Sequence, residues 1–318
     1  MRFNPKARLD TSRTSDGGGG GGGGMGGGPM RLPIPGGAAG GGGLGMVLIV
    51  ILFLVLNQCV GGGGLTGGAQ APDNSIDTSN VAAEDTGRYD NCKTGEDANS
   101  DPDCERIGVE NSLVSFWSKT IPAETNASFT PATLRTFSGA TSTGCGQATS
   151  QVGPFYCPND ATIYMDTSFF DDVLERQLGG PDGGFVQAYV LAHEYGHHIQ
   201  NLMGYMGRVR TQKGPRSDAV RLELQADCYG GMWTKAATST SDSGGEPLIA
   251  SLSQDDIQQA IDAAAAVGDD RIQQKTQGQV TEESWTHGSA DSRMKWFQVG
   301  WQQGTMQACE QVWTVDTP

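Results

Sequence analysis

The hexapeptide HEYGHH, from His193 to His198, contains three of the four histidines of the chain. His193 and His197 are four residues apart, so on an α-helix both side chains project from the same face, one turn apart. Three apolar side chains precede them on that face, at Val186, Tyr189 and Val190. This spacing predicts a helix, from about Gly184 to Leu202, whose partly buried face carries both imidazoles.

Glu194 stands between the two histidines and completes the HExxH pattern of zinc hydrolases. Neutral imidazole nitrogens are suitable ligands for Zn²⁺, and a carboxylate at this position can take a proton from metal-bound water. The alternative is a polar, solvated helix face that binds no metal, because so short a motif can also arise by chance. The rest of the chain favours the metal site.

A second helix, predicted from Ala219 to about Trp233, carries two acidic residues on one face. A zinc site with two histidines needs a third protein ligand and leaves one position for water. Glu223 is suited to be that ligand, because the interval after His197 leaves room for a turn between antiparallel helices. Asp227 can accept a hydrogen bond from the far nitrogen of a ligating histidine. The alternative, a solvated acidic face, is opposed by the apolar residues around the pair: Leu222, Leu224, Ala226 and Cys228.

The fourth histidine of the chain, His287, lies within Trp285-Thr-His-Gly-Ser289. It can donate a hydrogen bond to the oxyanion formed when a carbonyl is attacked, or it can cap the helix that begins near Ser289, and both alternatives stay open. For the reaction itself, we expect Glu194 to take the proton of a zinc-activated water and to return it to the leaving amine of a peptide bond.

The first part of the chain is dominated by glycine, with unbroken runs at Gly17–Gly24 and Gly40–Gly43. Such a segment loses much backbone entropy on ordering and buries little surface, so residues 1–43 are predicted to form a disordered arm. An apolar stretch follows, and residues 44–60 predict one uncleaved transmembrane helix at the short end of a membrane span. A cleaved signal peptide is the alternative, but the preceding segment is much longer than a normal n-region.

Charge divides the chain at the apolar stretch. The arm has an excess of basic residues, whereas the chain as a whole has a net charge of −15. Since positive residues mark the cytoplasmic side, we expect a single-pass membrane protein with its N-terminus in the cytoplasm and its catalytic domain outside. An acidic body of this kind does not attract nucleic acid, so no nucleic-acid partner is expected.

Six of the seven cysteines lie beyond the apolar stretch. An even number in an exported region is typical of disulfides rather than reduced thiols. Two short spacings suggest the pairs Cys92–Cys104 and Cys145–Cys157, which leaves Cys228 and Cys309 for a third. A zinc–cysteine site is the competing interpretation, but the C-x-x-C spacing that it requires does not occur in the chain.

For the acidic chain that follows the apolar stretch, we predict a linker over residues 61–84 and one folded domain over residues 85–318. This domain is long enough for a sizeable core. Residues 120–160 are rich in Thr, Ser, Gly and Pro and are expected to be mostly irregular. The remaining predicted elements are a strand and three further helices, at Ala161–Asp166, Val109–Lys119, Ser168–Gln177 and Ser253–Val267.

A specific resemblance to a known family rests on three stretches of the sequence. They are HEYGHHIQNLMG from His193, RLELQADCYGGMW from Arg221 and THGSADSRMKWFQVGWQQG from Thr286. Together they resemble the putative neutral zinc metallopeptidase family of membrane-anchored bacterial proteins, over roughly residues 85–312. The Glu-x-x-x-Asp arrangement is also similar to that of gluzincin-type metallopeptidases, in which the Glu is the third zinc ligand and the Asp its supporting partner. The Gly-rich arm falls outside this resemblance.

The resemblance implies a zincin-like α+β fold, mainly helical with a small sheet, for a zinc metallopeptidase domain at residues 85–318. It implies Zn²⁺ as cofactor, a peptide or protein as substrate, Glu223 as ligand and Asp227 as its neighbour. Two rival interpretations remain. The domain can keep the zinc fold and only bind a partner at the cell envelope, or it can hydrolyse a cell-wall amide with the same residues.

Overall fold

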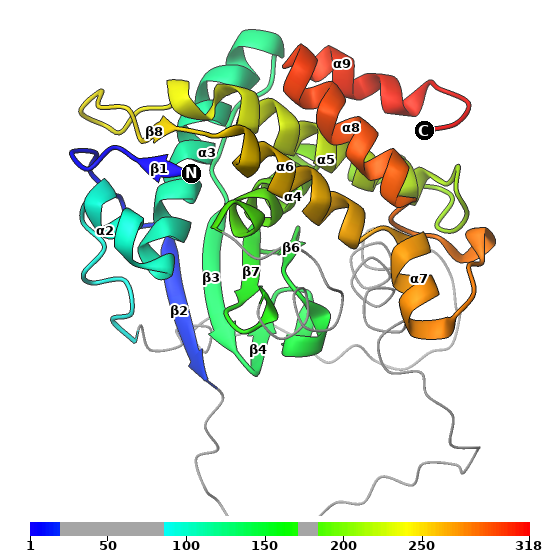
Figure 1. Ribbon diagram of the computed structural model, residues 1–318, viewed down its shortest axis with the longest axis horizontal. Helices are drawn as coiled ribbons and strands as arrows, with labels where there is room; N and C mark the ends of the chain where they lie inside the picture. Colours follow the sequence, from blue (N-terminus) through cyan, green and yellow to red (C-terminus); the bar gives the residue numbers. More distant parts are fainter. Residues whose placement is uncertain (20–85, 171–183) are drawn as a thin grey trace, which may run out of the picture.

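The computed structural model describes residues 1–19, 86–170 and 184–318. Figure 1 shows a small sheet in the lower half of the molecule and a layer of helices above it. The predicted transmembrane segment at residues 44–60, the linker at residues 61–84 and most of the helix predicted from Ser168 lie outside the described residues. Among the residues that are described, no helix is both long and apolar enough to cross a membrane.

Helices make up most of the upper layer (Figure 1). Their bounds are α2 Gly95–Ser100, α3 Pro102–Glu124, α4 Gly184–Leu202, α5 Asp218–Ala236, α6 Gln254–Ala266, α7 Asp269–Gln277, α8 Ala290–Gln303 and α9 Met306–Glu310. Helix α4 has the predicted bounds, and α5 begins one residue before the predicted Ala219, where the Ser217 side chain caps it by accepting a hydrogen bond from the Val220 N–H. Local signals therefore located the two helices that matter most for function.

The strands are short, with bounds β1 Arg2–Phe3, β2 Thr14–Gly19, β3 Thr133–Ser138, β4 Ala140–Thr143, β5 Gly146–Thr149, β6 Phe155–Cys157, β7 Thr162–Asp166 and β8 Ile249–Ser251. The main sheet has the order β2-β3-β7-β6, in which β2, β3 and β7 are parallel and β6 is an antiparallel edge strand. β1 pairs with β8 and β4 pairs with β5. This mixture of helices and small sheets is the predicted α+β class.

The prediction of irregular structure for residues 120–160 was wrong, because four strands lie there. Leu134 and Phe137 of β3 are buried, and Thr136 between them is also buried. Threonine is a good strand residue, but a strand this short is stable only when its partners flank it. Those partners, β2 and β7, come from distant parts of the chain, so the local composition did not reveal them.

The prediction of a disordered arm over residues 1–43 was wrong for residues 1–19. Both strands of this segment pair with strands of the body, by which we mean the described residues from 86 onward. Phe3 is 1% exposed. The glycine runs begin only at Gly17, whereas the residues before them carry side chains that pack into the domain. Treating the whole arm by its average composition concealed this difference.

Three disulfides join the cysteines of the body in the pairs that the spacings suggested: Cys92–Cys104, Cys145–Cys157 and Cys228–Cys309. The last of these ties α5 to α9. Helix α5 also packs closely on α8, where a Cβ atom at Gly300 would lie 1.9 Å from the backbone oxygen of Cys228. Only glycine permits this approach, which holds α8 against the helix that carries Glu223 and Asp227.

Candidate metal centre

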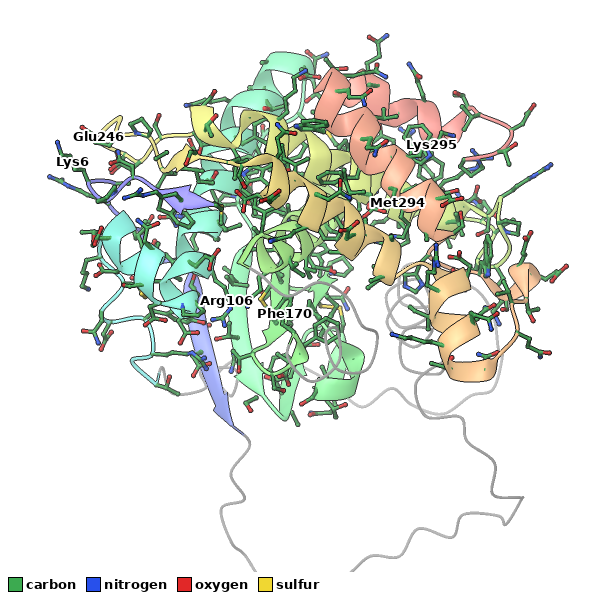
Figure 2. All side chains as sticks on the ribbon, viewed as in Figure 1. Lys6, Arg106, Phe170, Glu246, Met294 and Lys295 are labelled. Carbon is green, nitrogen blue, oxygen red and sulfur yellow. A yellow bond between two sulfur atoms is a disulfide. The ribbon has the colours of Figure 1, made fainter. Side chains whose placement is uncertain are left out.

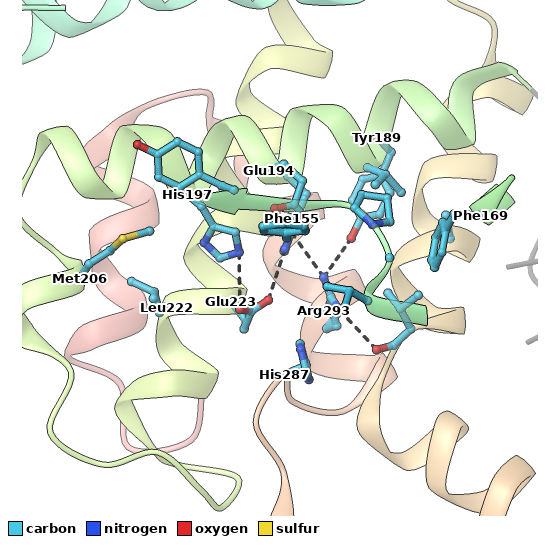
Figure 3. Close-up of a pocket in the computed structure, with 18 residues that line it drawn as sticks. Phe155, Phe169, Tyr189, Glu194, His197, Met206, Leu222, Glu223, His287 and Arg293 are labelled. Atoms are coloured by element: carbon cyan, nitrogen blue, oxygen red, sulfur yellow. Dashed lines mark hydrogen bonds and ion pairs between the residues drawn. The ribbon is translucent and has the colours of Figure 1, made fainter. Parts of the chain in front are cut away.

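Two neighbouring helices bring three possible ligands together. His193 and His197 come from α4 and Glu223 comes from α5 (Figure 3). The Glu223 carboxylate lies 3.2 Å from Nε2 of His193 and 3.4 Å from Nε2 of His197. The ligand atoms of the three residues all lie within 4.8 Å of one another, and the three side chains are buried. The structure therefore gathers the three predicted ligands into a group that can hold a metal ion.

The two helices approach closely because Gly196, inside the HEYGHH motif, has no side chain. A Cβ atom at this position would lie 3.0 Å from backbone atoms of Ala226, which is tighter than ordinary packing. Gly196 lies beside His197, and Ala226 lies beside Asp227. This glycine thus brings the carboxylates of α5 within reach of both imidazoles.

The second nitrogen of each histidine has a hydrogen-bond acceptor. Nδ1 of His193 lies 2.8 Å from Oδ1 of Asp227, and Nδ1 of His197 lies 2.8 Å from Oε1 of Gln200. Gln200 itself donates to the backbone oxygen of Leu222 at 2.6 Å, which fixes its side chain. When each Nδ1 carries the proton, each Nε2 keeps a lone pair for a metal ion. Asp227 lies where the sequence predicted it, whereas the contact of Gln200 was not predicted.

Arg293, on α8, is the main residue that the sequence analysis missed. Its Nε donates to Oδ2 of Asp227 at 2.8 Å, and its Nη2 donates to Oδ1 at 2.9 Å. The hydroxyl of Tyr189 donates to Oδ1 of the same carboxylate at 2.6 Å. A signal for Arg293 was present, because Trp296 and Phe297 follow at the spacing of one helix face and are buried.

This network sets the protonation of the centre. Burial raises the pKa of Asp227, but the charges of Arg293 and His193 outweigh it and hold that pKa at about 2. Burial lowers the pKa of His193, but the charge and hydrogen bond of Asp227, together with Glu223, raise it to about 10. The carboxylates of Asp227 and Glu223 therefore favour positive charge beside them.

Glu194 lies on α4 beside the ligands and lines the same pocket (Figure 3). Its carboxylate accepts a hydrogen bond from the backbone N–H of Tyr156 in the edge strand β6. Burial raises the pKa of Glu194, and the nearby His197 and His193 offset this only in part. A carboxylate with a raised pKa next to a metal site is suited to accept and return a proton.

His287 also faces the centre, below Glu223 in Figure 3. Its Nδ1 lies 3.3 Å from Oδ1 of Asp269, whose other oxygen accepts backbone N–H groups, including that of His287 at 2.7 Å. Helix α8 is capped by the Ser289 side chain, so the helix-cap alternative for His287 was wrong. Burial lowers the pKa of His287, but its hydrogen bond to Asp269 and the charge of that carboxylate raise it overall.

His198 points away from the ligands, although it is part of the motif. Its Nε2 lies 2.7 Å from the backbone oxygen of Thr130, and its Nδ1 lies 3.1 Å from the hydroxyl of Tyr156. The Tyr156 hydroxyl also accepts a hydrogen bond from Asn201 at 3.0 Å. His198 therefore holds β6 against α4 and does not take part in the cluster.

A pocket of about 880 Å³, including its opening to solvent, borders the cluster. Its polar lining includes Glu194, His287 and Arg293 beside the cluster. Much of the remaining wall is apolar, with contributions from Val152, Phe155, Phe169, Val190, Met206 and Val267. The pocket therefore places an apolar wall next to the cluster.

Comparison with known proteins gives the chain its family. Residues 4–312 match the putative neutral zinc metallopeptidase family, so the match begins well before the stretch from residue 85 that the motifs indicated. An uncharacterized protein of Mycobacterium tuberculosis (strain H37Rv) is 50% identical over 221 residues, which cover 69% of this chain and 73% of that protein. The uncharacterized protein YpfJ of Escherichia coli (strain K12) is 42% identical over 179 residues, covering 54% and 58% respectively. No solved structure matches the chain. The chain belongs to the putative neutral zinc metallopeptidase family.

Proposed function

We propose that the protein is a zinc metallopeptidase with a zincin-like fold that hydrolyses peptide bonds. The observation that carries the proposal is the meeting of His193, His197 and Glu223 from two helices, with Glu194 beside them. A catalytic zinc site has three protein ligands and an open position, and this cluster borders a pocket. The family to which the chain belongs supports the same reaction.

The residues fit Zn²⁺ by the chemistry of their donor atoms. Two imidazole Nε2 atoms and one carboxylate are the set found at hydrolytic zinc sites. Each imidazole is oriented through Nδ1, by Asp227 and by Gln200. When bound, Zn²⁺ supplies Lewis-acid polarisation of the scissile carbonyl and lowers the pKa of a coordinated water.

The other side chains account for the proton transfers and for the developing charge. Glu194 takes the proton of the attacking water and hands it to the leaving amine. His287 lies across Glu223 from α4 and donates to the oxyanion, with Asp269 holding its ring. Arg293 keeps Asp227 ionised, and through it the ring of His193 in place. A domain that only binds a partner has no need of Glu194 and His287 beside the ligands, so this placement favours an enzyme.

The substrate that we propose is a peptide or protein segment with an apolar residue next to the cleaved bond. The wall formed by Phe169, Val190 and Val267 supports this preference, because burying an apolar side chain there is favourable. We further propose that the chain is attached to a membrane through residues 44–60 and acts outside the cytoplasm. The three disulfides support this location, since they persist in oxidising compartments.

Metal removal tests the proposed function. We expect the purified full-length protein to contain about one zinc ion per chain, because the described part of the chain forms one three-ligand site. Treatment with a chelator should abolish cleavage of a peptide library with apolar residues, and added Zn²⁺ should restore it. Elemental analysis and a fluorogenic peptide assay measure the two quantities. A zinc-loaded protein that cleaves no peptide in the library would contradict the proposal.

Substitution of His287 tests its role in the reaction. We expect His287→Ala to lower kcat by about 10²-fold with a smaller change in KM, since loss of one oxyanion donor has an effect of this order. Zinc content should be unchanged, because His287 is outside the ligand set. The measurement is steady-state kinetics alongside elemental analysis. An unchanged kcat would assign His287 a purely structural role.

A further inference from the structure

The N-terminal segment, residues 1–19, completes the main sheet of the body. Strand β2 pairs in parallel with β3, with Thr14 opposite Leu134 and Asp16 opposite Thr136. The Asp16 carboxylate accepts hydrogen bonds from the Thr136 hydroxyl at 2.8 Å and from the Thr86 hydroxyl at 2.7 Å. Without this segment β3 would be an unpaired edge, with its backbone groups open to other chains.

An ion pair fastens the same segment to α3. The guanidinium of Arg13 donates to both oxygens of Glu110, at 2.8 Å from Nε and 3.1 Å from Nη2. The Glu110 side chain is 1% exposed. A carboxylate this deeply buried requires a cation partner, and in this fold Arg13 supplies it. Arg13, one of the basic residues that the sequence assigned to a cytoplasmic arm, is therefore part of the domain.

The body also has spaces shaped for the segment. A Cβ atom at Gly108 in α3 would lie 2.4 Å from the ring of Phe3, and one at Gly95 would lie 2.0 Å from the backbone oxygen of Asn4. Any larger residue at these two positions would displace the segment. Figure 2 shows Lys6 of the segment at the same end of the molecule as Glu246, whose carboxylate accepts a hydrogen bond from Asn4 at 3.3 Å.

We infer that residues 1–19 and the body lie on the same side of any membrane to which the chain is attached. The segment precedes the apolar stretch at residues 44–60, and the body follows it. One crossing of the membrane by that stretch would place Arg13 and Glu110 on opposite sides, and the ion pair and the β2–β3 ladder could not form. The family match from residue 4 agrees with a segment that belongs to the domain. This inference is independent of the proposed catalytic activity.

Accessibility of introduced cysteines tests the inference in right-side-out membrane vesicles. Ser12→Cys reports on the segment and Ser118→Cys on the body, each in a Cys59→Ser background, because both serines are exposed. We expect a membrane-impermeant maleimide to treat the two sites alike, labelling both or neither before detergent is added. Labelling of one site before detergent and of the other only after it would overturn the inference.

A charge exchange tests whether the segment is docked in the full-length protein. We expect Arg13→Glu and Glu110→Arg each to speed proteolytic cleavage about 100-fold, because each leaves a buried charge next to a like charge. The double variant should recover most of the resistance. Arg2→Glu, with the same charge change on an exposed side chain of the same segment, is the control and should have little effect. If Arg13→Glu is cleaved no faster than Arg2→Glu, the segment is not docked and the inference fails.

Discussion

Glu194→Gln is expected to lower kcat by about 10²–10⁴-fold while the protein keeps its fold and its zinc. The amide has nearly the same size as the carboxylate but cannot take a proton from water. Glu194 is not one of the three clustered ligands, so the substitution leaves His193, His197 and Glu223 intact. Steady-state kinetics on the peptide library measures kcat, and elemental analysis measures the zinc content.

The matched control is Glu283→Gln, which removes the same charge from an exposed residue that does not line the pocket. It should behave as the unaltered protein. Substantial peptide cleavage by the Glu194→Gln protein would show that another group is the base. Loss of zinc together with loss of activity would show instead that Glu194 helps to hold the metal. Either result would contradict the mechanism proposed for this residue.

Arg293→Met is expected to destabilise the fold by about 3–5 kcal/mol, because it leaves the fully buried Asp227 carboxylate without its cation. It should also weaken zinc binding by about 10–100-fold, since Asp227 orients the His193 ring. Urea denaturation of the metal-free protein and zinc titration with a competing chelator measure these two effects. Arg293→Lys keeps a charge but cannot bridge both oxygens of Asp227. Its stability and zinc affinity should therefore lie between those of the unaltered protein and the Arg293→Met protein.

Arg271→Met is the control for this substitution, because the Arg271 side chain is 65% exposed and makes only a 3.9 Å ion pair. It should change stability little. The ion pair between Arg293 and Asp227 also predicts that the stability of the fold depends on pH. The pKa of Asp227 is lowered to about 2, so its stabilising contribution is present above about pH 4 and is lost as the pH falls towards 2. An Arg293→Met protein as stable as the Arg271→Met protein would show that Asp227 does not depend on Arg293.

Helix periodicity depends only on residues that are close together in the sequence, and it was enough to predict the centre of the site. Two histidines one turn apart on α4, and Glu223 with Asp227 one turn apart on α5, follow from positions along two short stretches of chain. The caps at Ser217 and Ser253 are local for the same reason. The sequence alone therefore determined both helices, which face of each carries the chemistry, and the ligand types available to a metal.

Only the tertiary structure decided which distant groups surround that centre. Arg293 reaches Asp227 across 66 positions, and Asp269 reaches His287 across 18. Strand β2 lies beside β3 although more than a hundred residues separate Asp16 from Thr136. Such contacts depend on how helices and strands pack, and packing depends on the whole chain rather than on any window of it. For that reason the sequence predicted the ligands, whereas the fold revealed what orients them and where residues 1–19 belong.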